Sequence, residues 1–405
     1  MTSDVLRVLH VIPCVAERYG GPSTVIWPLT AALNRLGDVN SRIATTDADG
    51  PGRSIDPSAF LSKANLHVFP RTFTEQWKYS SALGRWLRAH VREFDIVHIH
   101  SVWSYSTGAA AAAARQCGVP YIIMPCGMFS DYCLATRRLK KWLYWQAIEG
   151  KTIRHAAAFH CTGEDEVSDV LKLRPTASTY LIPHGIEPAA FEAPRDVNEL
   201  RRRCGPAAAD RPIVLFLGRL HPVKGIIDHL LPAVTRMRSN AFVAIAGGAD
   251  ARCPDHPARI RDTIARLGLS DRIALLGAVG SADRWSLFDG ATAFVLPSHS
   301  ENFGMVVAEA MARACPVVVT QGVQSKAIVL EAGAGAVVPP HPDEIATALD
   351  RLVTDPIAAS AAGKAGREYV RTRLTWDSAA TRIRTMYRAI CLREPRPERS
   401  GMPTA

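Results

Sequence analysis

The amino-acid sequence predicts an α/β protein with two Rossmann-like, doubly wound domains that face each other across a cleft. Two observations predict this fold. Short β-branched apolar runs alternate with longer stretches of helical period, which is typical of βαβ units around a parallel sheet. The alternation is interrupted by a stretch rich in Pro, Ala and charge, and it then starts again. The length of 405 residues suits two or three domains of ordinary size.

The first half alternates between runs expected to be strands and runs of helical period. The expected strands cover residues 5–12, 41–46, 66–69, 95–100, 120–125, 157–161 and 179–182. The expected helices include residues 22–37, 80–92, 107–117 and 137–155. The six alanines at 109–114 predict a helix face of small residues that packs closely on the sheet.

The second half repeats this organisation. The expected strands cover residues 212–217, 241–246, 272–276, 292–296 and 316–319, and the expected helices cover 224–237, 256–268, 281–289 and 305–314. The predicted boundaries are a first domain at 1–187, a linker at 188–211, a second domain at 212–373, a final helix at 374–392 and a disordered tail at 393–405. In sheets of this kind ligands bind beyond the carboxyl ends of the strands, so functional residues are expected just after them.

Composition and charge restrict the class of protein. With 48 basic and 38 acidic residues the net charge is +10, which favours anionic partners such as nucleotides, phosphates, acidic lipids or nucleic acid. The nine cysteines form no C-x-x-C pair, so metal fingers and a disulfide framework are disfavoured and a reducing cytoplasm is expected. No apolar run approaches the roughly 18 residues of a membrane span, and residues 1–12 lack the features of a signal peptide.

The most informative stretch is Pro297–Gly304, which follows an expected buried strand and opens a helix. A helix start offers free backbone N–H groups to a phosphate, and Gly304 would let a ligand approach the backbone. Glu301 and Glu309 would lie about 12 Å apart along one helix axis, too far for a pair that acts across one bond. We therefore interpret them as two separate acceptors of ligand hydroxyl groups.

Two cations follow the first strand of the second half. Arg219 and Lys224 come after that strand, and a strand end that carries two cations beside a helix N-terminus forms a clamp for a diphosphate. Such a clamp neutralises a departing nucleoside diphosphate without a metal. Each cation alone is equally consistent with a surface ion pair.

Together these motifs resemble the retaining glycosyltransferases of family 4, which have the GT-B fold. Glu301-x7-Glu309 resembles the family signature, and residues 217–225 (LGRLHPVKG) resemble the family's G-R-x-x-x-x-K-G segment. Residues 19–22 (YGGP) resemble the glycine loop after the first strand, and residues 183–186 (PHGI) stand where the family has P-N-G-[VI], with His184 in place of Asn. The resemblance extends from about residue 5 to 391.

The resemblance implies roles for these residues. Arg219 and Lys224 would bind the donor diphosphate, Glu301 the donor sugar and Glu309 the ribose, with backbone amides of Asn302, Phe303 and Gly304 in support. Gly20 and Gly21 would contact phosphate or sugar, and Gly277 and Val279 would lie beside the base. The first domain would bind the acceptor, and the final helix would cross back onto it. Because no carboxylate is well placed as a covalent nucleophile, we expect front-face displacement assisted by stabilisation of the leaving group, with neither a metal nor another cofactor.

Other candidates in the first half are weaker. His98 and His100 point to one side of a strand, and we expect His98 in the core and His100 at the cleft as a catalytic residue. Spacing suggests no further metal ligand beside them. Cys126 stands where many relatives have a cleft histidine. Asp47-Ala48-Asp49 matches the D-x-D pattern of metal-dependent transferases, but we interpret it as a turn.

The segment 137–145 is both basic and aromatic. It could hold an anionic acceptor or dock on an anionic membrane surface, whereas the alternative is a helix whose Trp142 and Trp145 are buried and whose cations are solvated.

The sequence thus favours a cytoplasmic glycosyltransferase, peripheral on the inner face of the membrane if that helix docks there. It would transfer sugar from a nucleotide-sugar donor to a glycan or lipid-linked acceptor in cell-surface polysaccharide synthesis. Alternatives are a GT-B sugar-nucleotide epimerase or hydrolase, or a basic nucleic-acid-binding protein, for which the chain shows no recognisable motif.

Overall fold

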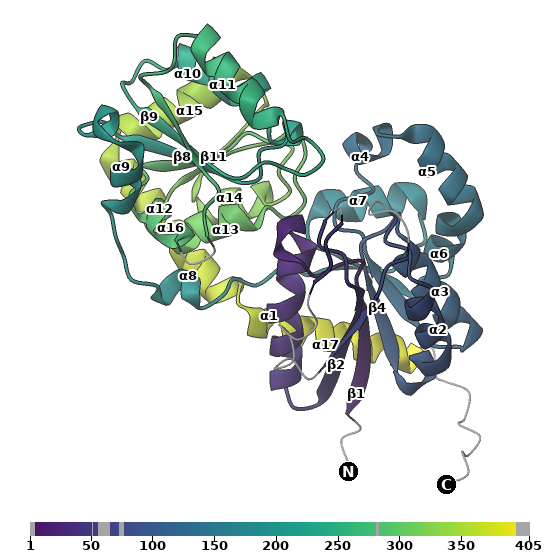
Figure 1. Ribbon diagram of the computed structural model, residues 1–405. Coiled ribbons are helices and arrows are strands. Elements are labelled where there is room, and N and C mark those ends of the chain that lie inside the picture. The colour runs from purple at the N-terminus through teal and green to yellow at the C-terminus, as the bar shows by residue number, and fades with distance from the viewer. Residues whose placement is uncertain (1–4, 51, 56–64, 73–76, 281–282, 394–405) are drawn as a thin grey trace. The chain divides into compact units, whose positions relative to one another are not determined.

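The computed structural model describes residues 5–50, 52–55, 65–72, 77–280 and 283–393 (Figure 1). The chain divides into two compact units. The first unit comprises Met1–Pro183 together with Trp376–Ala405, and the second comprises His184–Thr375. The tail that the sequence predicts to be disordered lies outside the described residues from 394 onward.

Within its described residues, the first unit contains a seven-stranded parallel sheet in the order β3-β2-β1-β4-β5-β6-β7. Its strands are β1 (Leu6–Val11), β2 (Val39–Thr46), β3 (Leu66–Phe69), β4 (Ile96–His100), β5 (Tyr121–Met124), β6 (Ala158–Cys161) and β7 (Thr179–Leu181). The strand order reverses at β1 and β4, which is the usual place for a ligand in a doubly wound sheet.

Helices on both faces bury the core of the first unit. They are α1 (Pro22–Arg35), α2 (Ser81–His90), α3 (Tyr105–Gln116), α4 (Asp131–Ala135), α5 (Arg138–Tyr144), α6 (Gly150–Arg154), α7 (Glu164–Leu173) and α17 (Trp376–Arg393). The alanine-rich helix α3 buries Ala110, Ala111, Ala113 and Ala114, as the small-residue face predicts. A π-helical turn at Trp145–Glu149 joins α5 to α6 where the sequence predicts one helix.

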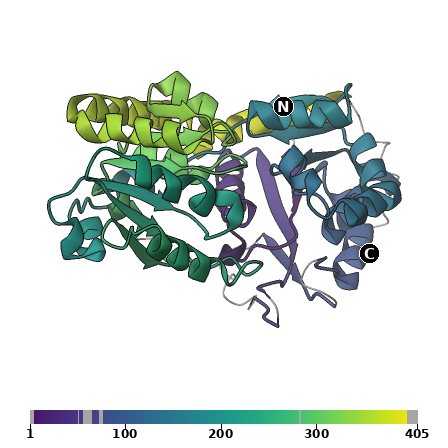
Figure 2. The same ribbon diagram turned by 90° about the horizontal axis from the view of Figure 1, so that it is seen from above.

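The C-terminal helix α17 packs beside α1, and Figures 1 and 2 show it in yellow along the sheet of the first unit. Arg35 donates to Asp377 at 2.6 Å, and Arg384 and Arg388 both pair with Asp38. The Tyr387 hydroxyl lies 2.7 Å from Nδ1 of His98 in β4. Helix α17 therefore belongs to the first unit and buries part of its face there, although it follows the second unit in the sequence.

The second unit contains, in its described residues, a six-stranded parallel sheet in the order β10-β9-β8-β11-β12-β13. Its strands are β8 (Ile213–Leu217), β9 (Phe242–Ala246), β10 (Ile273–Gly277), β11 (Ala293–Leu296), β12 (Val317–Thr320) and β13 (Gly335–Val338). Here the order reverses at β8 and β11, so the loops that follow these two strands leave the same edge of the sheet side by side.

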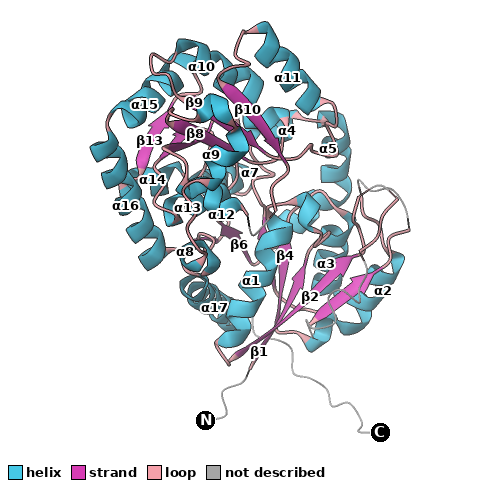
Figure 3. Cartoon of the chain, turned by 60° about the vertical axis from the view of Figure 1, so that its left-hand side comes forward, coloured by secondary structure: helices cyan, strands magenta, loops and turns pink. Residues whose placement is uncertain are grey.

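Helices cover both faces of the second sheet as well (Figure 3). They are α8 (Ala189–Glu192), α9 (Glu199–Cys204), α10 (Leu231–Arg236), α11 (His256–Arg266), α12 (Arg284–Asp289), α13 (Met305–Ala312), α14 (Lys326–Ala332), α15 (Pro342–Thr354) and α16 (Pro356–Arg373). Short turns at Pro222–Lys224 and Ile226–Leu230 precede α10.

The predicted fold class, two Rossmann-like α/β domains, is confirmed, and two local predictions differ from the structure. Residues 188–211 contain α8 and α9 and belong to the second unit, because Ala190, Leu200 and Ala208 are buried in its core. The expected helix at 281–289 is described only from residue 283, and there α12 begins at Arg284. Among the described residues, no helix is long and apolar enough to cross a membrane.

Candidate active site

The loops that follow β8 and β11 in the second unit are joined to each other. The His299 amide donates to the Val223 carbonyl at 2.8 Å, and Nδ1 of His229 lies 2.8 Å from the Pro297 carbonyl. Gly225 has φ 66°, and a Cβ there would lie 2.1 Å from the Pro297 oxygen. Only glycine fits this contact, which places the preceding residue, Lys224, against the second loop.

Lys224 and Glu301 form an ion pair between these loops. The Lys224 side chain is buried and that of Glu301 is partly exposed, so the pair lies at the edge of the core. Backbone contacts fix Glu301: its amide donates to the Gly322 carbonyl at 2.9 Å, and its own carbonyl accepts from Gln324 at 3.2 Å. The structure thus brings together two residues that the sequence assigned to one site from separate motifs.

Helix α13 begins just after Glu301. Gly304 takes a left-handed conformation with φ 70° and caps the helix, while Phe303 is buried against the ring of His184 at 5.3 Å. The carbonyl of Asn302 accepts from the Gln324 amide at 3.3 Å. The substitution of His for Asn at position 184 therefore supplies a ring that packs behind the turn preceding α13.

Glu309 lies on the buried side of α13, so the two glutamates are separate as predicted, one in the loop and one on the helix. Burial raises the pKa of Glu309, the nearby Arg284 opposes this shift, and Glu187 adds to it. Arg284 at the start of α12 lies 3.2 Å from the Glu309 carboxylate. The sequence reasoning missed Arg284, because an arginine in a helix that covers a sheet has no distinctive spacing.

Arg219 is paired with Asp250, which lies in the loop after β9 and also accepts hydrogen bonds from Arg252. The Leu220 amide donates to the Gly248 carbonyl at 2.8 Å, so the loops after β8 and β9 continue the pairing of their strands. The sequence reasoning missed both Asp250 and Arg252. Both residues follow the end of a predicted strand, and that position in the sequence could have indicated them as site residues.

The loop after β10 lies against the loop after β9. Gly277 is the last residue of β10, and its carbonyl accepts from the Gly247 amide at 2.7 Å. Gly277 is exposed and Val279 is partly buried. The predicted base-side residues therefore lie next to the loop that carries Asp250, and contact with a base stays a prediction.

The site residues that the sequence predicts in the first unit are Gly20, Gly21 and His100. Gly20 and Gly21 have φ values of 61° and 38° and form the turn that opens α1, where their carbonyls accept from Ser23 and Thr24. The expectation that His100 faces a cleft is wrong: its side chain is 1% exposed, and its Nε2 lies 2.9 Å from Nδ1 of His10. His100 is packed against the rings of His10 and His98.

His10, His98 and His100 place one nitrogen each within 4.8 Å of one another. The sequence reasoning found no third imidazole because His10 comes from β1, next to β4 in the sheet but 88 residues before His98. Burial lowers the pKa of His10 to about 3, so its ring is neutral at physiological pH. The three imidazoles are buried, and a nitrogen of each already has a partner: Nδ1 of His10 contacts Nε2 of His100 at 2.9 Å, and Nδ1 of His98 contacts the Tyr387 hydroxyl at 2.7 Å. We therefore do not assign a metal to this cluster.

Cys126 and the aspartates of the D-x-D pattern make local contacts within the first unit. The Cys126 thiol donates to the Met124 carbonyl at 3.4 Å, and burial together with Glu166 raises its pKa, so it stays protonated. Asp47 accepts from the Arg71 amide at 2.9 Å, and the Asp49 amide donates to Arg53 within the turn. These contacts agree with the interpretation of the pattern as a turn.

The predicted basic and aromatic segment corresponds to α5 and its flanks. Leu139, Trp142 and Leu143 are 71%, 57% and 54% exposed, and Arg137, Arg138 and Lys140 are exposed beside them. Trp145 is partly buried against Trp103. The alternative with both tryptophans buried is therefore wrong for Trp142, and Trp145 does not belong to the exposed surface.

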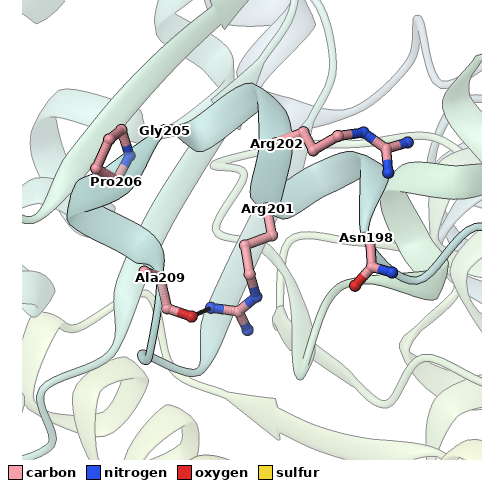
Figure 4. A pocket seen from close by; sticks show the side chains of 6 residues that line it. All are labelled: Asn198, Arg201, Arg202, Gly205, Pro206 and Ala209. Carbon is pink, nitrogen blue, oxygen red and sulfur yellow. Dashed lines mark hydrogen bonds between the residues drawn. The ribbon is translucent and has the colours of Figure 1, made fainter.

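A pocket in the described residues of the second unit lies elsewhere, around α9 (Figure 4). It is lined by Asn198, Arg201, Arg202, Gly205, Pro206 and Ala209. The Arg201 guanidinium already has a hydrogen-bond partner there, since it donates to the Ala209 carbonyl at 2.5 Å. None of the predicted site residues lines this pocket, and we assign it no function.

Two Rossmann-like units, the second with paired cations and carboxylates at its strand ends, have the architecture of the GT-B fold. Residues 198–369 match the family described as glycosyl transferases group 1, and residues 20–185 match the glycosyl transferase 4-like domain. The D-inositol 3-phosphate glycosyltransferase of Stackebrandtia nassauensis is 30% identical over 323 residues, 76% of this chain and 71% of that protein. The chain therefore belongs to the glycosyltransferases.

Solved structures agree with this fold. A sucrose-phosphate synthase from Thermosynechococcus elongatus superposes with a TM-score of 0.75 at 21% identity, over 96% of this chain and 100% of that one. Anabaena HepE in complex with UDP and glucose superposes with a TM-score of 0.76 at 18% identity, over 95% of this chain and 100% of that one. At these identities the likeness shows the fold alone.

Proposed function

We propose that this glycosyltransferase uses a nucleotide-diphosphate-sugar donor, transfers the sugar with retention to a glycan or lipid-linked acceptor, and needs no metal. The observation that carries the proposal is the contact between Lys224 and Glu301 at the ends of β8 and β11, with Arg219 in the same loop as Lys224. A role in cell-surface polysaccharide synthesis is part of the proposal. The structural neighbours in complex with UDP, UDP-glucose and UDP-2-fluoro glucose support a nucleotide-sugar donor.

The charges of the site suit departure of a nucleoside diphosphate. As the sugar–phosphate bond breaks, negative charge grows on the phosphate, and Arg219 and Lys224 are fixed cations that stabilise it. Such cations do the work that a metal does in D-x-D enzymes. Glu301 is paired with Lys224 and is therefore better suited to accept a hydrogen bond from a sugar hydroxyl than to attack carbon. This arrangement favours front-face displacement.

The donor is tested with a panel of UDP-, GDP- and ADP-sugars. A donor that binds only the folded chain raises the melting temperature, and the sugar that does so is then offered glycan, lipid-linked and phosphorylated small acceptors with product detection. Transfer that persists in EDTA supports the proposal. Turnover of the donor without an acceptor would indicate an epimerase or hydrolase, and salt-sensitive binding to DNA without any nucleotide-sugar binding would indicate a nucleic-acid-binding protein.

We also propose that the exposed surface of α5 docks on an anionic membrane. Leu139, Trp142 and Leu143 supply apolar area, and Arg137, Arg138 and Lys140 supply positive charge, the two contributions that a reversible surface helix uses. Each cation near an anionic leaflet contributes about 1 kcal/mol, screened by salt, so attachment is weak and reversible. That suits an enzyme that must release a growing lipid-linked product.

Vesicle co-sedimentation tests the docking surface. Binding should rise with anionic lipid, fall with salt, and weaken both in Arg138→Ala/Lys140→Ala and in Trp142→Ala/Leu143→Ala. The matched control is Leu330→Ala/Ile357→Ala, which removes two exposed apolar side chains from the second unit and should bind as the parent does. Equal retention by neutral and anionic vesicles would contradict the proposal and favour a soluble acceptor.

A further inference from the structure

Three loops converge at the carboxyl edge of the second sheet, and the loop after β9 carries a charged group outside the predicted site. The Asp250 amide lies 3.5 Å from the Leu220 carbonyl, and Leu220 and Ala249 form an isolated parallel bridge. Gly247 is obligatory here, because a Cβ at this position would lie 1.8 Å from the Gly218 carbonyl oxygen. The two loops are thus in contact along their length, which places Asp250 beside Arg219.

Asp250 binds two guanidinium groups at once. Its carboxylate is 3% exposed and pairs with Nη1 of Arg219. It also accepts from the Arg252 amide at 2.9 Å and from Nε and Nη2 of Arg252 at 3.0 Å each. Burial alone would raise the pKa of Asp250, but hydrogen bonds from Arg252 and the charge of Arg219 outweigh it and hold that pKa well below its usual range. The carboxylate is therefore ionised at any physiological pH.

The balance of charge points to an anionic ligand. Two guanidinium groups face the single Asp250 carboxylate, and Lys224, in the same loop as Arg219, is paired with Glu301 from the loop after β11. The side chains of Arg219 and Arg252 are 42% and 66% exposed, so both reach solvent at the strand ends. A guanidinium held on one side by a carboxylate has a fixed orientation, which suits it to bind phosphate oxygens.

We propose that Arg252 is a further phosphate-binding residue of the donor site and that Asp250 is the positioning residue that holds Arg219 and Arg252 together. The proposal rests on the proposed function, since the ligand is the diphosphate of the donor nucleotide. It adds a third cation, from the loop after β9, to Arg219 and Lys224. Asp250 touches no substrate and acts through the two arginines.

A purely structural role for Asp250 makes a different prediction. If the carboxylate only closes the loop, Asp250→Asn lowers the melting temperature and leaves the affinity of the folded protein for a nucleoside diphosphate unchanged. If the carboxylate positions the arginines, Asp250→Asn lowers the affinity for nucleotide. That loss of affinity should depend on how many phosphates the nucleotide carries and on the presence of Arg219. Calorimetry with UDP, GDP, ADP and the matching nucleoside monophosphate separates these cases.

The exposed Arg252 allows a variant with little risk to folding. Arg252→Gln should weaken binding of the preferred nucleoside diphosphate about tenfold, the loss of one charge-assisted contact, and should weaken the monophosphate less. The matched control is Arg261→Gln on α11, which removes the same charge from another exposed arginine and should bind as the parent does. An Arg252→Gln protein with parental affinity for the diphosphate overturns the proposal.

A double-mutant cycle tests the positioning role of Asp250. Asp250→Asn should weaken diphosphate binding in the parent but have little further effect in Arg219→Gln/Arg252→Gln, and Asp250→Glu should recover part of the affinity. Equal losses in both backgrounds overturn the positioning role. Failure of the parent to bind any of the three diphosphates overturns the proposed function itself, a result distinct from parental affinity in the variants.

Discussion

Lys224 is the buried cation that lies between the loops after β8 and β11. Lys224→Ala should lower the rate of transfer at saturating donor about 10- to 150-fold, because the ammonium meets charge that grows in the transition state. Arg219→Ala should have an effect of similar size. Steady-state kinetics on protein with a parental melting temperature provides the measurement, and Lys364→Ala, an exposed lysine of α16, is the control. Parental turnover in either site variant would contradict the diphosphate clamp.

Glu301 and Glu309 should have separable roles, since one is in the loop beside Lys224 and the other is on α13 beside Arg284. Glu309→Gln should weaken binding of the bare nucleoside diphosphate, because it removes the expected ribose contact. Glu301→Gln should leave that affinity largely intact and impair sugar transfer. Calorimetry with the bare diphosphate, followed by transfer assays, distinguishes them, and equal affinity losses would refute the division.

At the scale of single residues, the sequence could predict those members of the candidate site that recur in motifs, and their roles stay predictions. Glu301, Glu309, Arg219 and Lys224 each occupy a recognisable position after a strand. It could not predict their partners: Asp250 and Arg284 come from other loops and helices, and only the folded sheet edge brings them near. The prediction that His100 faces a cleft failed for a related reason. The alternation of side chains along a strand predicts the side of the sheet on which a residue lies, but it does not predict which residues cover that side.

At the scale of elements, the buried histidines of β1 and β6 make the first unit sensitive to acid. Burial lowers the pKa of His10 to about 3 and that of His160 to about 4, with smaller effects from His160 and Arg382 respectively. The unfolded chain has ordinary histidines with a pKa near 6.5 and so binds protons first. Stability is thus unaffected above about pH 6.5 and falls below it, by about 1.4 kcal/mol per pH unit for each histidine.

Urea unfolding at pH 7.5 and at pH 5 measures this loss. His98 packs against both His10 and His160, and His100 packs against His10, so none of these ring neighbours is an acid that could pair with a protonated imidazole. His160→Gln should reduce the pH dependence of the first unit, whereas the exposed His155→Gln should leave it unchanged. An identical slope in both variants would assign the acid sensitivity to carboxylates elsewhere.

A buried ion pair fastens the segment that precedes α9 to the second unit. Arg313 and Asp289 are both fully buried; Nε of Arg313 lies 2.9 Å from the carboxylate, and the guanidinium also donates to the Ala193 carbonyl at 2.9 Å. Arg313→Ala should destabilise the second unit by about 3–5 kcal/mol, because Asp289 would keep an uncompensated buried charge. Chemical denaturation measures the loss. The double variant Arg313→Met/Asp289→Leu should recover much of it, and no recovery would contradict this account.

Helices and strands were predicted correctly where the hydrophobic pattern of the sequence was strong. Prediction failed where tertiary contacts determine the structure of a segment. The strands from β1 to β12 lie within a few residues of the predicted runs, since buried parallel strands are short and β-branched. Strand β13 was missed, because Gly335–Val338 contains glycine and alanine and is a short edge strand. The Pro-, Ala- and charge-rich composition of 188–211 suggested a linker, but Arg313 and the core residues hold that segment in the second unit.

At the scale of the whole molecule, the first unit is discontinuous in sequence. Its first segment ends at Pro183, and the helix that completes it, α17, begins 193 positions later at Trp376. A chain that ends at Thr375 should lose protection against hydrogen exchange in the first unit only. Its sheet would lose contact with Ile383, Tyr387 and Ile390, which are buried on α17. A chain that ends at Arg393 is the control. Uniform loss of protection in both units would contradict this prediction.

The discontinuity of the first unit also sets an order for biosynthesis. The ribosome makes proteins from the N-terminus, and domains generally fold as units in that order. Here all of His184–Thr375 is synthesised before α17 exists, so the second unit can complete its core while the first still exposes the face that α17 will cover. The usual order of maturation is thereby reversed: the unit whose synthesis begins first is completed last.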